Sequence, residues 1–211
     1  MLTAFTAGLL LITLSELGDK TFFIAVILSI RYSRKLVFIG VTLALAVMTI
    51  LSVFVGKIVS VLPETYLHYG EIILFCTFGI KLLYDASKMS ATSNKEEEKE
   101  AAEAVEKSES KFPKHNSNSL GIILEAFLLT FTAEWGDRTQ IATIALAASY
   151  QPLGVVLGAT LGHSICAAIA VIGGRLIAGK ISERMITAIG GCLFILFGLV
   201  AIWEGVGTHS I

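Results

Sequence analysis

Six long apolar runs constrain the fold of this chain more than any other feature. A transmembrane helix needs about 20 consecutive, mostly apolar residues, and each run meets that length. The runs cover residues 2–30, 36–61, 68–89, 119–149, 152–178 and 183–205. The alternating apolar and polar decapeptides that are typical of an outer-membrane barrel do not occur in them. The sequence therefore predicts an all-α polytopic membrane protein with six transmembrane helices.

Composition indicates the same class. Of the 211 residues, 55% are hydrophobic and 16% are charged, whereas soluble chains average about 25% charged residues. The net charge is −1 and there is no basic arm, so we expect the lipid bilayer, and no nucleic acid, as a partner. The first run lacks the basic start of a signal peptide and is expected to remain as a permanent helix. The cysteines have neither metal-like nor disulfide-like spacing: Cys76, Cys166 and Cys192.

One charged hexapeptide occurs twice inside these apolar runs. It reads Glu-Leu-Gly-Asp-Lys-Thr at residues 16–21 and Glu-Trp-Gly-Asp-Arg-Thr at residues 134–139. If the runs cross a bilayer, four carboxylates and two cations lie near its middle. Ionisable groups at that depth cost roughly 2.5–3.5 kcal/mol each by insertion scales, which makes them functional candidates.

The chain divides into two halves that flank a charged segment. Residues 1–90 and 119–211 each hold three apolar runs and one motif copy, and residues 91–118 carry seven glutamates and five lysines. Such a segment cannot bury enough apolar surface to order itself, so we interpret it as a solvated linker. An odd number of spans per half predicts that the second half is inverted relative to the first, as in many secondary transporters.

Basic residues between the runs predict the orientation of the chain. The first, third and fifth loops share one side of the membrane and carry nearly all of the basic loop residues. By the positive-inside rule this side is cytoplasmic, so both termini lie on the opposite side. The residues are Arg31, Arg34, Lys35, the linker lysines, Lys180 and Arg184.

The motif residues suit an oxygen-lined cation site. Glu and Asp three residues apart share a helix face, and an inverted repeat would bring the two pairs together at the midplane. Oxygen ligands of this kind suit Mn²⁺, Ca²⁺ or Mg²⁺, which we expect as a transported substrate, with no permanently bound cofactor. The predicted ligands are Glu16, Asp19, Glu134, Asp137, Thr21, Thr139 and Gln140.

Charge balance suggests how transport could be coupled to protons. With the two basic neighbours, Lys20 and Arg138, the four carboxylates leave a net charge of −2. One divalent cation or two protons would neutralise it, and a low-dielectric site resists net charge. A site that holds either metal or protons, and opens alternately to the two sides, would work as an antiporter.

The glycine within each motif has two possible roles. Gly18 and Gly136 could break their helices, because glycine weakens a helix by about 1 kcal/mol relative to alanine. The freed carbonyl groups would then become additional ligands, as in transporters with discontinuous helices. Alternatively, each glycine could simply allow a neighbouring helix to approach closely. The sequence does not choose between these roles.

The motif pair also resembles a known family. Two copies of Glu-x-Gly-Asp-(Lys/Arg)-(Thr/Ser) in six predicted helices, with an acidic central segment, are similar to the Gdt-type cation/proton exchangers. The resemblance covers nearly the whole chain and extends in particular to the cyanobacterial manganese exporters, which are also short and lack a leader. It implies export of Mn²⁺, and also Ca²⁺, from the cytoplasm across a thylakoid or plasma membrane. The implied functional positions are residues 16, 18–21, 134 and 136–139.

Three other interpretations compete with an exchanger. The motifs could be internal salt bridges that hold helices together, but acids outnumber bases in them. A passive divalent cation channel would use the same carboxylates without obligatory proton movement. An intramembrane aspartyl protease is suggested by Gly18-Asp19 alone, yet it would have no use for Glu16 and Glu134.

Overall fold

The computed structural model describes residues 1–89, 95–111, 118–177 and 183–208. Within these ranges the chain forms helices joined by short turns and contains no strand, so the expected all-α fold is confirmed. The helices are α1 (Leu2–Glu16), α2 (Lys20–Arg31), α3 (Arg34–Val59), α4 (Glu64–Lys88), α5 (Lys95–Lys111), α6 (Ser119–Ala133), α7 (Arg138–Ser149), α8 (Pro152–Ile177) and α9 (Glu183–Thr208).

Each motif interrupts its apolar run with a turn, whereas the sequence left open whether the motif glycines break their helices. Residues 2–30 form α1 and α2, and residues 119–149 form α6 and α7, which are bent by 76° relative to each other. The backbone reason is the glycine of each motif, because Gly18 has φ +84° and Gly136 has φ +85°. Residues other than glycine rarely adopt this left-handed conformation. Both copies of the motif are therefore turns between two half-length helices.

Four helices within the described residues are long and apolar enough to cross a membrane by themselves. They lie at Arg34–Val59, Glu64–Lys88, Pro152–Gly173 and Arg184–Trp203, and the bent pair α6 and α7 would make a fifth span. Many of their large apolar side chains are exposed, including Phe54 at 64% and Ile73 at 65%. Exposed apolar surface on this scale indicates contact with lipid. The chain is thus a membrane protein.

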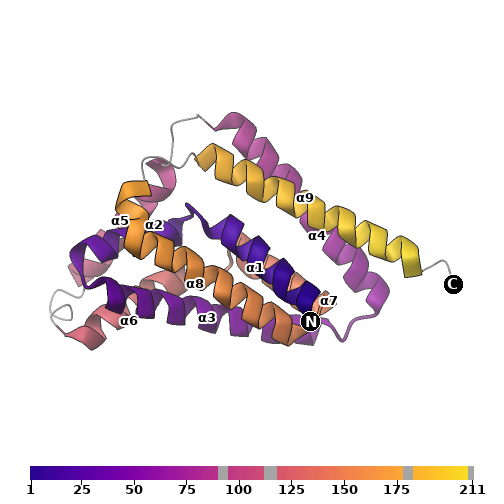
Figure 1. Cartoon of the computed structure of the whole chain (residues 1–211), viewed down its shortest axis with the longest axis horizontal. Helices are drawn as coiled ribbons and strands as arrows, with labels where there is room; N and C mark the ends of the chain where they lie inside the picture. The colour runs from indigo at the N-terminus through magenta and orange to yellow at the C-terminus, as the bar shows by residue number, and fades with distance from the viewer. Residues whose placement is uncertain (90–94, 112–117, 178–182, 209–211) are drawn as a thin grey trace.

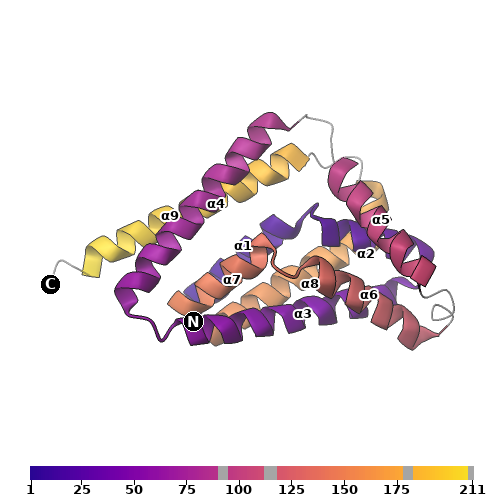
Figure 2. The same ribbon diagram turned by 180° about the vertical axis from the view of Figure 1, so that it is seen from behind.

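Two helix pairs organise the molecule (Figures 1 and 2). The long helices α3 and α8 run beside each other, and the four half-length helices pack against them. Helices α4 and α9 form a second pair, which contacts the rest of the bundle mainly through α1 and α7. The first break is buried at Gly18, whereas the second break is exposed at Trp135 and Gly136.

Glycines set the closest helix contacts. A Cβ atom on Gly158 of α8 would overlap the carbonyl oxygen of Phe5 in α1, and one on Gly40 of α3 would lie 2.6 Å from the carbonyl oxygen of Ile123 in α6. Gly158 lies 118 residues after Gly40, and Ile123 lies 118 residues after Phe5. This spacing is also the offset of the two motifs. The same helix contact is thus made twice.

The linker is not an unstructured tether over its whole length. Residues 95–111 form helix α5, which packs on α2 and α6. Ala101 and Val105, one helical turn apart, are both fully buried. The sequence alone did not reveal this apolar stripe, because charged residues surround it. The stripe has too little area to order an isolated segment, but it packs against the apolar surface of α2. The remaining linker residues, 91–94 and 112–117, lie outside the described part of the chain.

Candidate cation site

The two breaks place four carboxylates at the ends of four half-length helices. Glu16 is the last residue of α1, and Glu134 follows α6 directly. Asp19 and Asp137 are the residues that precede α2 and α7, and the Asp137 carboxylate accepts a hydrogen bond from the Thr139 amide at 3.4 Å. Acidic side chains are favoured at a helix N-terminus, where the amide groups carry partial positive charge.

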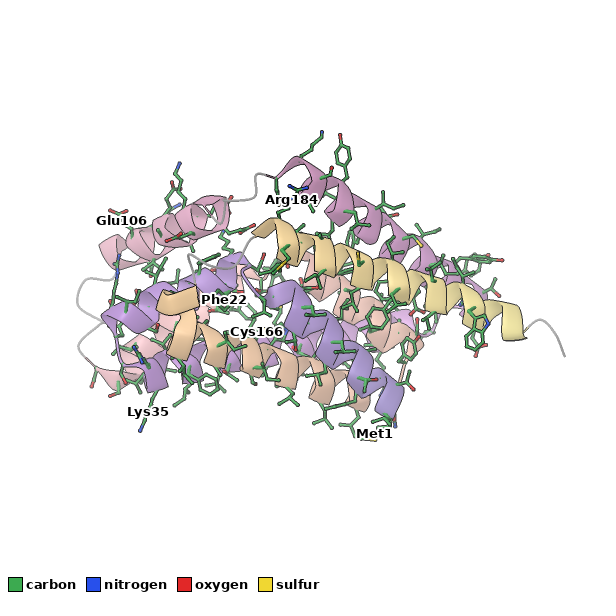
Figure 3. All side chains as sticks on the ribbon, turned by 45° about the horizontal axis from the view of Figure 1, so that its top comes forward. Met1, Phe22, Lys35, Glu106, Cys166 and Arg184 are labelled. Carbon is green, nitrogen blue, oxygen red and sulfur yellow. The ribbon has the colours of Figure 1, made fainter. Side chains whose placement is uncertain are left out.

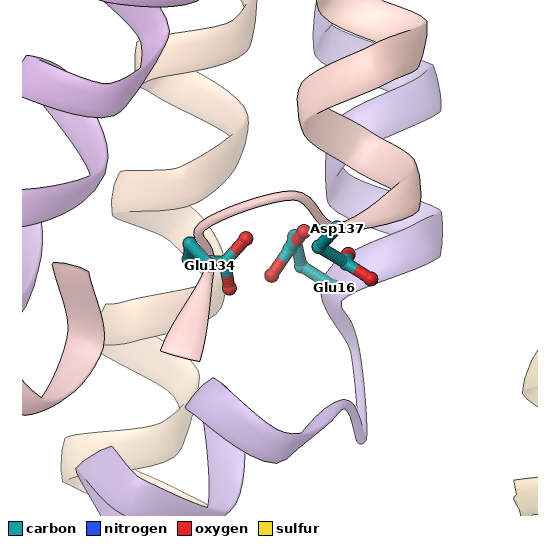
Figure 4. A group of neighbouring side chains, drawn as sticks. All are labelled: Glu16, Glu134 and Asp137. Atoms are coloured by element: carbon teal, nitrogen blue, oxygen red, sulfur yellow. The ribbon is translucent and has the colours of Figure 1, made fainter. Parts of the chain in front are cut away.

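Three of the four carboxylates converge (Figure 4). One oxygen atom from each of Glu16, Glu134 and Asp137 lies within 4.8 Å of the other two. Two of these side chains are almost completely enclosed, since Glu16 and Glu134 are each 2% exposed. We call these three residues the carboxylate triad. It combines both halves of the chain in one buried group of acids.

Threonines of the motifs orient the triad. Thr21 donates its hydroxyl to Glu16 at 3.3 Å, and the hydroxyl of Thr139 lies 3.4 Å from Glu134 and 3.2 Å from Asp137. The second oxygen of each glutamate, Oε1, is buried without a hydrogen-bond partner among the described residues. Buried carboxylate oxygens normally have partners, so these two atoms are suited to a cation.

Asp19 stands apart from the triad because it is paired with arginine. The Arg138 guanidinium lies 3.4 Å from the Asp19 carboxylate and 3.8 Å from that of Asp137. This contact joins the first motif to the second. Asp19 and Arg138 also line a cavity of about 60 Å³ at the break between α1 and α2. The predicted group of four carboxylates is therefore a triad with a neighbouring ion pair.

Comparisons with known proteins indicate the family of the chain. The sequence profile of the divalent cation/proton antiporter family GDT1 matches residues 4–90 and 122–209, which include both motifs. The chain belongs to the GDT1 family. The resemblance seen in the motifs is thus confirmed, and the family is one of transporters.

Individual relatives extend over most of the chain. It is 59% identical to the GDT1-like protein sll0615 of Synechocystis, over 96% of this chain and 98% of the relative. It is 44% identical to GDT1-like protein 4 of Oryza sativa subsp. indica, over 93% and 72% of the two chains. It is 42% identical to the chloroplastic PAM71-homolog protein of Arabidopsis thaliana, over 92% and 58%. No solved structure matches the chain.

Two predicted site residues of this GDT1-family chain lie away from the triad. Lys20 points to α5, where its ammonium group is 3.0 Å from Glu100. Gln140 accepts a hydrogen bond from the Gly136 amide at 2.7 Å and donates to the sulfur of Met48 at 2.9 Å. The amide of Gln140 therefore holds the break between α6 and α7, and Arg138 is the basic motif residue that contacts the acids.

Sulfur atoms near the site were missed because they are remote in sequence. Met48 contacts Gln140, and Cys166 lines a small pocket together with Glu16 and donates to the Thr13 carbonyl oxygen at 3.3 Å. Their numbers differ by 118, which is the motif offset. A search for polar or sulfur-containing pairs at that offset could have found them in this GDT1-family sequence.

Proposed function

We propose that the protein is a secondary transporter that exports Mn²⁺, with Ca²⁺ as a further substrate, from the cytoplasm in exchange for protons. The observation that carries this proposal is the triad, whose oxygen atoms lie within 4.8 Å of one another. Ligands at about 2.4 Å from one ion can be at most about 4.8 Å apart, and Ca²⁺ takes oxygen ligands at about 2.3–2.6 Å. Carboxylates also suit Mn²⁺.

Burial supplies the reason for proton exchange. Two of the three triad acids, Glu16 and Glu134, are almost completely enclosed, and the one nearby guanidinium of Arg138 lies beside Asp19 and Asp137. Because the Lys20 ammonium group is paired with Glu100 of α5, the four acids and Arg138 leave a charge of −3, instead of the −2 expected from the sequence. A low-dielectric site favours a constant net charge. Exchanging one divalent cation for two protons keeps the charge constant whatever its starting value, so we infer that ratio.

We infer six crossings in two inverted halves. In this arrangement α1 with α2 is one broken span, α6 with α7 is another, and α3, α4, α8 and α9 are the rest. Support comes from the two glycine turns and from the repeated contacts of Gly40 with Ile123 and Gly158 with Phe5. Broken helices that meet at the midplane are typical of inverted-repeat transporters.

Loop charge supports a cytoplasmic linker. Lys35 and Glu106 of α5 lie at one end of the molecule and Met1 lies at the other (Figure 3). The turn between α2 and α3, which carries Arg31, Arg34 and Lys35, belongs to the first of these ends, and basic loops remain on the cytoplasmic side. We therefore place Met1 and the C-terminus on the opposite side. The chloroplastic name of one relative supports a thylakoid membrane, and the plasma membrane is the other location proposed.

Transport by purified protein tests the proposal. Liposomes that contain the protein and a trapped pH dye receive Mn²⁺ or Ca²⁺, and the Asp137→Asn protein serves as the inactive variant. Asp85→Asn is the matched control, because Asp85 lies on α4 outside the group of four acids. We expect metal uptake with opposite proton movement, driven uphill by a pH gradient, in the wild type and in Asp85→Asn only.

Other outcomes identify the competing functions. Metal uptake that only follows its own gradient, without proton movement, would favour a passive channel. Absence of flux for every divalent cation would leave internal salt bridges or proteolysis as the role of the motifs. Full transport by Asp137→Asn would exclude the triad as the cation site.

A further inference from the structure

Helix α5 brings one acidic residue to the cation site from outside the two repeats. The helix is fixed on the bundle by Ala101 and Val105, which are fully buried and belong to the same apolar core as Phe22 and Phe23 of α2. Its glutamates differ in their surroundings. Glu98 faces solvent, whereas Glu97 is half-buried and faces inward.

Glu97 shares a cavity with the ion pair of the two motifs. The cavity of about 60 Å³ is lined by Asp19, Arg138 and Glu97, together with side chains of α4 and α9. A cavity needs about 10–15 Å³ to hold a water molecule, so this one has room for several. A partly hydrated cation could therefore reach Asp19 beside Glu97. The inference that follows rests on the proposed function.

Arg138 and an arriving cation compete for Asp19. Arg138 lies 3.4 Å from the Asp19 carboxylate, and like charges repel strongly at such distances when partly buried. When a cation binds Asp19, the guanidinium must move away and needs another partner. Glu97 lines the same cavity as Arg138 and carries the opposite charge. Arg138 lines this cavity and its side chain is 39% exposed, so the guanidinium can shift within this space.

We propose that Glu97 is the counter-charge that receives Arg138 when a cation takes its place at Asp19. Glu97 then acts as a positioning residue for cation binding, because it lowers the cost of separating Arg138 from Asp19. The linker helix is part of the transport machinery on this view, and not only a connection between the halves. The contact of Lys20 with Glu100 at 3.0 Å helps to hold the helix where Glu97 can act.

Two neighbouring glutamates provide a matched test. Glu97→Gln and Glu98→Gln change the net charge of the same helix equally, but only Glu97 lines the cavity. Wild type, both variants and Glu97→Asp are compared for Mn²⁺ uptake into liposomes and for Mn²⁺ binding by equilibrium dialysis. We expect Glu97→Gln to raise KM and Kd about tenfold with a maximal rate within twofold of wild type. Glu98→Gln should match wild type, and Glu97→Asp should restore part of the affinity.

The results separate this inference from the proposed function. If wild type exchanges Mn²⁺ for protons and Glu97→Gln has the same KM and Kd as Glu98→Gln, the role of Glu97 is refuted while the transporter assignment stands. A lower maximal rate for Glu97→Gln with unchanged KM and Kd also refutes it, because a counter-charge acts on binding. If wild type neither binds nor moves Mn²⁺, both proposals fail.

Discussion

Glu134→Gln is expected to stabilise the protein without metal and to abolish its stabilisation by metal. The substitution keeps the shape of the side chain but removes one acid from the triad. Two ionised carboxylates separated by at most 4.8 Å repel each other by at least roughly 3.5 kcal/mol at an effective dielectric constant of about 20. Protons shared among the acids relieve part of this repulsion. We therefore expect a gain of about 1–2 kcal/mol, or roughly 2–8 °C in Tm for a chain of this size.

Metal should stabilise the wild type much more than the Glu134→Gln protein. A ligand present at 100 times its Kd stabilises the folded state by about 2.7 kcal/mol, which corresponds to roughly 5–11 °C. The wild type should show this increase with Mn²⁺, because the triad supplies its ligands. Glu134→Gln loses one ligand and one charge, so the same Mn²⁺ concentration should raise its Tm by less than about 2 °C.

Thermal unfolding of detergent-solubilised protein measures both effects. Each protein is heated with a chelator and then with excess Mn²⁺, and Glu64→Gln, an exposed acid at the start of α4, serves as the control. The control should behave as wild type in both conditions. A Glu134→Gln protein that is less stable than wild type in the chelator, or that retains the full Mn²⁺ shift, would refute the reasoning from the triad.

Further predictions concern the motif threonines and three glycines. Thr139→Val should raise the Kd for Mn²⁺ about tenfold, because the Thr139 hydroxyl lies near two triad carboxylates and such bonds contribute about 1.5–3 kcal/mol. Thr21→Val should have a smaller effect, because Thr21 contacts only one glutamate of the triad. Equal effects of the two substitutions in a binding assay would contradict this reasoning. Gly136→Ala should destabilise by about 1–2 kcal/mol because its φ is +85°. The control Gly70→Ala, which meets no atom within 4 Å in helix α4, should be neutral or stabilising in thermal unfolding, so a common sign for both substitutions would argue against backbone strain. Gly158→Ala should lower the free energy of unfolding by about 1–3 kcal/mol, because the new methyl group overlaps an α1 carbonyl oxygen. A Tm like that of wild type would mean that α1 and α8 separate freely.

The sequence was sufficient to find the acids of the site because its signals are linear. Hydropathy located every long helix to within a few residues, and a charged motif inside an apolar run is conspicuous. The duplication at an offset of 118 residues further indicated that the copies act together. Three of the four predicted carboxylates are indeed neighbours, although Glu16 and Glu134 are far apart in the chain.

The rest of the arrangement depends on contacts that no local pattern contains. Whether Gly18 and Gly136 break the helix or admit a neighbour is decided by backbone conformation, which here is left-handed at both. The pairing of Asp19 with Arg138 depends on how the halves fit together. Helix α5 is ordered by apolar surface on α2, so its composition alone gave the wrong expectation. Local rules failed mainly where tertiary contacts between distant segments decide the structure.

The two motif copies have unequal surroundings, and this difference bears on how the site could open alternately to the two sides of the membrane. Arg138 contacts Asp19 across the repeats, whereas its counterpart Lys20 is held on α5 by Glu100. Under the proposed inverted repeat, the opposite-facing state would exchange these roles, and Lys20 would have to leave Glu100. The described part of the linker forms a single helix, so this contact stabilises only one of the two states. A partly exposed pair contributes about 0.2–1 kcal/mol, which is at most about a fivefold bias. A bias of this size leaves both states populated, as alternating access requires.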